Sequence, residues 1–317
     1  MAITTSTILP PPVQAHFDRA LLAVPYPNLI HGLVAQYRDM PAHGGNTWRG
    51  RRYNRLLTAE VPLGPSGATP PAQVATALDI DAKIQWYGTF VRLNEQVVIS
   101  NQEPVLNEIV KLLGLSMRET EDKLIRDMLA STATSVNCVG GGNGNNPTNI
   151  AGSDIDRVAR NLIGNNAWTV TDNIEGENRI GTSPIRNAFV AMCHSDLITD
   201  LDSIPRWESK ADYANASKSL NSEWGAYRNV RFFVSSQGSI DFQAAALFSA
   251  DVYNIFVCGV DAYGVVNQTL ASAKFVYRDP LYDGPLAQNA SVGYKFASAQ
   301  VIYQDEWIQK LRATLAA

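Results

Sequence analysis

The sequence predicts an α+β fold in which one long helix lies among many strands. Residues 104–134 place apolar side chains at helical spacing, with Glu, Lys and Arg between them. Most other apolar runs are short and rich in β-branched and aromatic residues, which is typical of strands. The chain has 317 residues, 45% of them hydrophobic, so it can bury a sizeable core. No unit of roughly 20–50 residues repeats, which excludes a solenoid or a propeller.

The first forty residues predict an arm without a core of its own. The run Ile8-Leu-Pro-Pro-Pro-Val13 cannot begin a helix or a central strand, and Pro25 and Pro27 interrupt the next apolar stretch. We therefore expect this segment to lie on another surface.

An extended hairpin is expected after the arm. Its strands are predicted at Arg52–Val61 and Ile80–Ile99, which are rich in Tyr, Leu, Val and Thr with partial two-residue alternation. Between them lies a proline- and glycine-rich loop, Pro62–Pro71. Because an isolated two-stranded hairpin is marginal in water, we expect another chain to be its partner.

The long helix is predicted at Pro104–Thr134, with Pro104 in its first turn and Gly114 as an internal weak point. A glycine- and asparagine-rich loop, Gly140–Pro147, follows it. A shorter helix, Ser153–Ile163, is expected to use Ser153 or Asp154 as its N-cap. The remaining expected elements are a helix at Ser195–Leu201, a polar stretch at Trp207–Tyr227, a short terminal segment at Asp305–Leu315, and strands at Asn187–Cys193, Val230–Val234, Asp251–Val257, Lys274–Tyr277 and Ser291–Tyr303.

Groups that could carry chemistry do not form a recognisable constellation. The Gly140–Asn146 run lacks the Gly-Lys-Ser/Thr ending of a phosphate loop and follows a helix instead of a strand. Cys193 and His194 are adjacent on a predicted strand, so they point to opposite faces and cannot form a dyad. Helix capping and solvation explain the acidic group Asp196, Asp200 and Asp202. The histidines stand alone, without a second ligand at metal-site spacing: His16, His31, His43 and His194. We expect no catalytic residue, no cofactor and no metal ion.

The three cysteines are isolated from one another and lie among apolar or small residues, so we expect buried, reduced thiols. Met1–Leu9 lacks the basic start and apolar core of a signal peptide. No window approaches about 18 uninterrupted apolar residues, so we expect no membrane span and a cytosolic chain.

Positive charge is concentrated near the N-terminus, although the whole chain has a formal net charge of −4. The first 58 residues contain six arginines against two aspartates. On an extended strand Arg49, Arg51 and Arg55 share one face, with Arg52 opposite. Three interpretations stay open: a contact with a neighbouring subunit, which we favour, a solvated strand edge, and a nucleic-acid site. The candidate interface residues are Arg49, Arg51, Arg52, Arg55, Trp48 and Tyr53.

Four motifs in the second half of the chain carry a resemblance to a known family. They are Thr182–Asp196, Phe256–Gly264, Arg278-Asp-Pro-Leu281 and Ser291-Val-Gly-Tyr-Lys295, followed by Ile302 and Arg312. Their order and spacing resemble the major capsid proteins of short-tailed double-stranded DNA bacteriophages.

This resemblance implies the tailed-phage and herpesvirus capsid fold. The implied parts are an N-terminal arm (1–45), an extended E-loop (46–100), a P-domain with a spine helix (101–204, helix 104–134), an A-domain (205–270) and return strands of the P-domain (271–317).

The implied function is a structural, non-enzymatic one. The chain would assemble as pentamers and hexamers into an icosahedral head, located in the virion and built in the cytoplasm of the bacterial host. Portal and scaffolding proteins are implied partners, a decoration protein is a further one, and packaged DNA would be contacted non-specifically at most. Two alternatives are another phage assembly protein, such as a tail-tube or decoration subunit, and a hydrolase using Asp196, Asp200 or His194.

Overall fold

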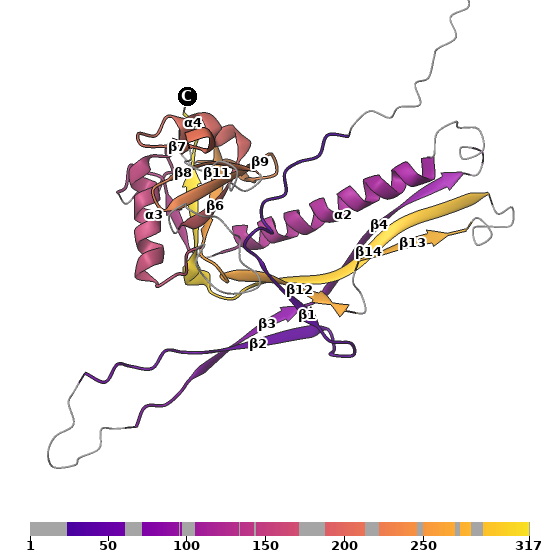
Figure 1. Cartoon of the computed structure of the whole chain (residues 1–317), viewed down its shortest axis with the longest axis horizontal. Helices are drawn as coiled ribbons and strands as arrows, with labels where there is room; N and C mark the ends of the chain where they lie inside the picture. Colours follow the sequence, from indigo (N-terminus) through magenta and orange to yellow (C-terminus); the bar gives the residue numbers. More distant parts are fainter. Residues whose placement is uncertain are drawn as a thin grey trace, which may run out of the picture.

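The computed structural model has an elongated body, a compact lobe at one end of it and a hairpin that projects away from both (Figure 1). It describes residues 24–60, 72–94, 96, 105–132, 134–142, 144–170, 188–212, 222–245, 250–269, 273–279 and 288–316. Its mixture of one long helix with many strands confirms the α+β prediction.

The elongated body consists of the long helix α2 (Val105–Ala130) lying along a five-stranded sheet. The strands of this sheet are β1 (Gln36–Met40), β4 (Gln85–Asn94), β12 (Tyr263–Gln268), β13 (Lys274–Arg278) and β14 (Asn289–Ile302). β14 is the organising strand, because it pairs with β4 on one side and with β13 and β12 in succession on the other. The apolar face of α2 packs on β4 and β14 through a cluster that includes Leu113, Tyr294 and Phe296.

The compact lobe is built on an eight-stranded sheet. Its strands are β5 (Ser135–Asn137), β6 (Phe189–His194), β7 (Glu208–Ser209), β8 (Glu223–Tyr227), β9 (Val230–Ser235), β10 (Ser239–Ala245), β11 (Ala250–Cys258) and β15 (Ile308–Ala313). The described helices of the lobe are α3 (Gly152–Gly164), α4 (Ile198–Asp202) and the short 3₁₀ turns η1 (Ser195–Leu197), η2 (Lys210–Asp212) and η6 (Asp305–Trp307).

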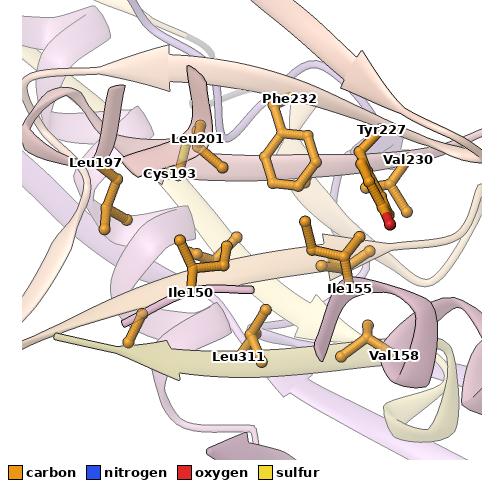
Figure 2. Packing of buried hydrophobic residues seen from close by; sticks show 14 of the residues in the cluster. Ile150, Ile155, Val158, Cys193, Leu197, Leu201, Tyr227, Val230, Phe232 and Leu311 are labelled. Atoms are coloured by element: carbon orange, nitrogen blue, oxygen red, sulfur yellow. The ribbon is translucent and has the colours of Figure 1, made fainter. Parts of the chain in front are cut away.

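Both faces of the lobe sheet are covered, which explains why β6 is a continuous apolar run. Phe189 and Ala191 join the core beneath α3 and α4, while Val190 and Met192 join the core on the other face. Figure 2 shows the first of these cores, with Phe232 of β9 above Ile155 of α3. Burying each large apolar side chain stabilises the fold by about 1.5–3 kcal/mol.

The hairpin forms a sheet of its own from β2 (Thr47–Tyr53) and β3 (Ala77–Lys83). β3 ends at Lys83, and β4 begins at Gln85 in the sheet of the body. The predicted hairpin strands were therefore placed wrongly. The first ends at Tyr53, and the second is two strands that belong to different sheets, because β14 offers β4 a partner that the hairpin cannot. The loop predicted at Pro62–Pro71 lies outside the described residues.

The second half of the predicted arm is part of the fold of its own chain. Ile30 is fully buried and Val34 is 8% exposed, both packed beneath the lobe sheet. Residues Gln36–Met40 form β1, which pairs in parallel with β12. Residues 30–40 of the predicted arm therefore lie on another surface, as expected, but that surface belongs to the same subunit. Residues 1–23 lie outside the described part of the chain.

The helix α3 begins without the predicted cap. Its N-cap residue is Ala151, which makes no side-chain cap hydrogen bond. Ser153 and Asp154 lie inside the helix, and the Asp154 carboxylate is directed at another loop. Predictions at the other long elements were closer: α2, β9, β11, β13 and β14 all lie within a few residues of the expected ranges.

The two larger sheets do not follow the expected segment boundaries. β6 was expected in the P-domain range 101–204, yet it pairs with β9 and β11 of the range 205–270. β12, from that same range, joins the sheet of the body. Among the described helices, none is long and apolar enough to cross a membrane.

Candidate subunit interface on the extended hairpin

The hairpin is fastened to the body at its base by a stack of aromatic rings and guanidinium groups. The ring centroids of Trp48 and Tyr303 lie 5.9 Å apart. The Arg38 guanidinium lies 5.8 Å from the Trp48 ring and 5.2 Å from the Tyr303 ring. Arg52 donates a hydrogen bond of 3.3 Å to the Tyr303 carbonyl oxygen. Trp48 and Arg52 thus make contacts within their own subunit, and their part in a contact between subunits stays a prediction.

Arg49 and Arg51 pair with the opposite strand of the hairpin. Arg49 Nε donates to Asp81 Oδ1 at 2.6 Å, and Arg51 Nε donates to Asp79 Oδ1 at 2.7 Å. The antiparallel register places each pair directly across from one another. The hydrogen bonds from the arginines hold the pKa of both carboxyl groups below the ordinary value. Because all four side chains are substantially exposed, the pairs contribute little to stability.

Arg55 lies beyond the last paired residue of β2 and is exposed. It makes no hydrogen bond or ion pair with any residue in the described ranges. Tyr53, beside it, is 70% exposed. Of the four arginines, Arg55 is therefore the one that has neither a hydrogen bond nor an ion pair within the described residues.

Sequence reasoning missed the apolar surface of the distal ribbon, which we define as residues 54–60 and 72–76. Its two chains are held together by a hydrogen bond of 2.9 Å from the backbone N–H of Leu57 to Gln73 Oε1 and by one of 3.0 Å from Gln73 Nε2 back to the Leu57 carbonyl. Leu57 is 81% exposed, Val74 82% and Leu56 55%. The adjacent leucines were the available signal, because two consecutive apolar residues on an extended chain cannot both face one core.

The residues considered for hydrolytic chemistry are engaged in structural hydrogen bonds. His194 Nδ1 accepts from the backbone N–H of Asp196 at 3.2 Å, so the network assigns the proton to Nε2, which donates to the Ser236 carbonyl at 3.0 Å. The Asp196 carboxylate accepts from the Tyr253 hydroxyl at 2.9 Å. His194 is therefore the cap of η1, where the sequence suggested an aspartate.

Asp200 and Asp202 are separated from that group by their own partners. Asp200 accepts from the backbone N–H of Ala316 at 3.0 Å, and Asp202 accepts from Trp224 Nε1 at 2.9 Å. Asp200 thus binds the backbone after β15, and Asp202 binds a side chain of β8, so the two carboxylates do not converge on one site.

The loop after β5 is filled by a carboxylate of the same chain. Asp154, fully buried, accepts from the backbone N–H groups of Val139 at 3.1 Å, Gly140 at 3.2 Å and Gly141 at 2.6 Å. Three converging amides make a good anion site. Since Asp154 occupies it, these three amides are not available to a phosphate.

The three cysteines are free and buried, as predicted. Burial raises the pKa of Cys193 to about 12 and raises those of the other two thiols further, so none is a thiolate at neutral pH. Within the described ranges, no group of three or more His, Cys, Asp and Glu side chains gathers in the way a metal site requires.

His31, which looked isolated in the sequence, has a buried partner on α2. Its backbone N–H and its Nδ1 lie 2.8 Å and 2.7 Å from the two carboxylate oxygens of Asp122. The Tyr263 hydroxyl donates to the His31 carbonyl at 2.6 Å. Because 91 residues separate His31 from Asp122, no spacing rule could have found the pair.

A cleft of about 300 Å³ lies between β1, α2 and β12, with Asp39 and Glu121 in its lining. Burial, together with the charge of Asp122, raises the pKa of Glu121 above the ordinary value. Neither Asp39 nor Glu121 forms an ion pair with the residues that the structure describes. The cleft thus holds negative charge that a guanidinium could compensate.

One protein family matches the sequence over most of its length. The sequence profile of the family described as phage capsid protein matches residues 76–301. No curated protein matches the sequence at a significant level.

Solved structures share the fold over almost the whole chain. The acid-stable capsid of Helicobacter pylori bacteriophage KHP30 is similar with a TM-score of 0.70 at 10% identity, covering 99% of this chain and 99% of that one. The capsid of Ralstonia phage GP4 has a TM-score of 0.66 at 11% identity, covering 100% and 99%. The capsid of cyanophage P-SCSP1u has a TM-score of 0.64 at 13% identity, covering 98% and 94%.

Proposed function

We propose that this chain, which belongs to the phage capsid protein family, is the repeating subunit of an icosahedral phage head. Its function is structural and not enzymatic. It assembles as pentamers and hexamers that enclose the double-stranded DNA genome. A closed shell of this kind repeats heterologous contacts until the rotation closes.

The observation that carries the proposal is the hairpin. It projects from the body (Figure 1), and its distal ribbon exposes Leu56, Leu57 and Val74 with no described side chain to cover them. A two-stranded ribbon cannot bury an apolar face alone. A neighbouring subunit in the shell supplies the missing surface, so that each hairpin folds fully only on the body of the next copy.

The arginines of the hairpin belong to the same boundary. Arg49 and Arg51 keep their carboxylate partners within the hairpin, so Arg55 is the cation available to a neighbour. The cleft with Asp39 and Glu121 has the complementary charge. An exposed pair of this type contributes only about 0.2–1 kcal/mol, but every copy in the shell repeats it.

Other partners and the place of assembly follow from this role. The head is built in the cytoplasm of the bacterial host, around a scaffolding protein and a portal, and a decoration protein attaches from outside. Contacts with the packaged DNA are non-specific. The expected segments remain part of this proposal as ranges of the chain: arm 1–45, E-loop 46–100, P-domain 101–204 with returning strands 271–317, and A-domain 205–270. Within these ranges β4 and β12 belong to the sheet of the body, and β6 belongs to the sheet of the lobe.

Electron microscopy of the purified chain tests the assembly. Shells are expected from the native chain. Replacing Leu56, Leu57 and Val74 together by serine is expected to stop at unassembled subunits with an unchanged circular dichroism spectrum. A matched control carries serine at Val24, which is 53% exposed but lies outside the hairpin. Tubes from the native chain, or normal shells from the triple variant, would contradict the proposal.

A charge exchange tests the arginine contact separately. Arg55→Glu is expected to reduce the yield of shells, and adding Glu121→Lys in the same chain is expected to restore it. Arg206→Glu, a reversal of an exposed arginine in the lobe, serves as the control. If Arg55→Glu shells form normally but fail to package DNA, the residue faces the genome and the interface assignment is wrong.

A further inference from the structure

The sheet of β4, β14 and β13 has one face that the described chain leaves largely uncovered. Figure 1 shows α2 lying along these strands. Tyr294 and Phe296 of β14 face α2. On the opposite face, Ala297 and Ala299 are covered by residues at the base of the hairpin, including Ala82. The remainder, which we call the open face, contains Trp86, Phe90, Val276, Lys274 and Lys295.

An apolar row crosses the middle of the open face. Phe90 of β4 and Val276 of β13 lie directly opposite Gly293 of β14, one on each side. Phe90 is 64% exposed and Val276 45%. A Cβ at Gly293 would lie 2.7 Å from the Phe90 Cβ, so the centre of the row is necessarily bare backbone. Exposed apolar rows on a sheet are typical of protein contact surfaces.

Positive charge lies on both sides of this row. Lys274 and Lys295 are directly opposite one another in adjacent strands, with Gly88 as the third member of the row. Like charges directly across a sheet destabilise it. Neither lysine has an ion-pair partner in the described part of the chain.

On the other side of the apolar row, Arg92 and Arg278 both face Ser291. Both arginines have interactions within the described chain, so the charge of the open face that lacks a described partner is that of Lys274 and Lys295.

We propose that the open face is a docking surface for an extended, acidic segment of a different protein that attaches to the assembled shell. Its apolar side chains lie on the row of Phe90, Gly293 and Val276. Its carboxylates meet the lysine pair beside this row, which removes the repulsion between Lys274 and Lys295. This rests on the proposed function only in requiring an assembled shell.

Charge decides against two other occupants. The distal ribbon of a second copy is apolar, but with Arg55 and Glu60 as its charged residues it has no net negative charge to offer the lysine pair. A nucleic acid would neutralise the cations, yet it would leave Trp86, Phe90 and Val276 uncovered in water. An acidic segment with apolar residues between its carboxylates satisfies both features.

The first measurement asks whether the shell leaves the face open. Lysines of shells made from this chain alone are acetylated with a limiting reagent and compared by mass spectrometry with those of unassembled subunits. Lys274 and Lys295 are expected to react equally in both states. Protection of both in the shell would show that a second copy covers the face, which overturns this inference and leaves the proposed function intact.

The second measurement uses a fluorescein-labelled synthetic peptide in which Glu alternates with Leu and Val, added to the same shells. Binding is expected to weaken about tenfold in the Lys274→Glu/Lys295→Glu variant and in Phe90→Ser, but not in the control Lys83→Glu on the hairpin. Should the double variant not assemble, Phe90→Ser and Val276→Ser, which keep the charge, decide the question. Equal binding by the native and variant shells, or tighter binding of a DNA duplex than of the peptide, would overturn the proposal.

Discussion

Replacing Asp122 with alanine is expected to release the N-terminal segment from the long helix. Asp122 is 4% exposed, and both of its carboxylate oxygens are bound by His31, which is itself 1% exposed. The alanine variant leaves the backbone N–H and the Nδ1 of His31 buried without an acceptor. Through these two short hydrogen bonds, a side chain of α2 binds the segment 24–34.

The magnitude follows from the two bonds. A hydrogen bond to a charged group contributes about 1.5–3 kcal/mol, and a buried donor left without a partner costs about 1–3 kcal/mol. The two bonds share one pair of residues, so they do not add fully. We expect the free energy of unfolding to fall by about 3–5 kcal/mol, as when one partner of a buried pair is removed. Asp122→Asn keeps an acceptor for the His31 N–H and is expected to lose about half as much.

Urea unfolding of the unassembled subunit, followed by tryptophan fluorescence at neutral pH, measures this difference. The control is Glu119→Ala on the same helix, where a partly exposed i,i+4 pair with Lys123 is lost at about 0.5 kcal/mol or less. If Asp122→Ala lies within about 1 kcal/mol of this control, the buried pair does not anchor the segment and the reasoning fails.

Three further predictions concern other buried or paired groups. Iodoacetamide at pH 8 is expected to leave all three thiols, including Cys193 with its pKa of about 12, unmodified until the chain is denatured, and alkylation of the native chain seen by mass spectrometry would contradict this. The pKa values of Asp79 and Asp81 are lowered in the folded hairpin, so their ion pairs with the arginines are intact above pH 3.8, the ordinary pKa, and are lost only as the pH falls through the lowered pKa values. A ¹³C-carboxyl NMR titration that finds ordinary pKa values for both groups would refute this prediction. Glu223→Leu leaves the buried Arg231 without this carboxylate and is expected to lower the free energy of unfolding by about 3–5 kcal/mol. Adding Arg231→Met is expected to recover most of that loss, which urea unfolding measures.

The sequence predicted the elements whose pattern is local. α2 has a helical period that its own residues display, and β14 is a long run of small, aromatic and β-branched residues that no helix cap interrupts. β6 was recognisable because both of its faces are buried, which leaves a continuous apolar run. The absence of a catalytic constellation was also visible in the sequence, since that judgement needs only residue types and spacings.

The tertiary structure decided what depends on partners far along the chain. β1 is polar and would not be a strand alone, but β12 offers it a parallel edge. The predicted second strand of the hairpin divides at Ile84, because residues before it pair with β2 and residues after it pair with β14. A periodic pattern says which residues seek burial, but it does not say which of two sheets buries them.

The candidate interface shows the same division. The sequence alone predicted that arginines and an unsupported hairpin occur together, which pointed to a contact with another subunit. Only the folded chain decided that Arg49 and Arg51 are paired within the hairpin, that Trp48 packs on Tyr303, and that Arg55 has no partner among the described residues. The physical reason is that charge and apolarity are properties of residues, whereas compensation and burial are properties of pairs, and pairs are set by the tertiary register.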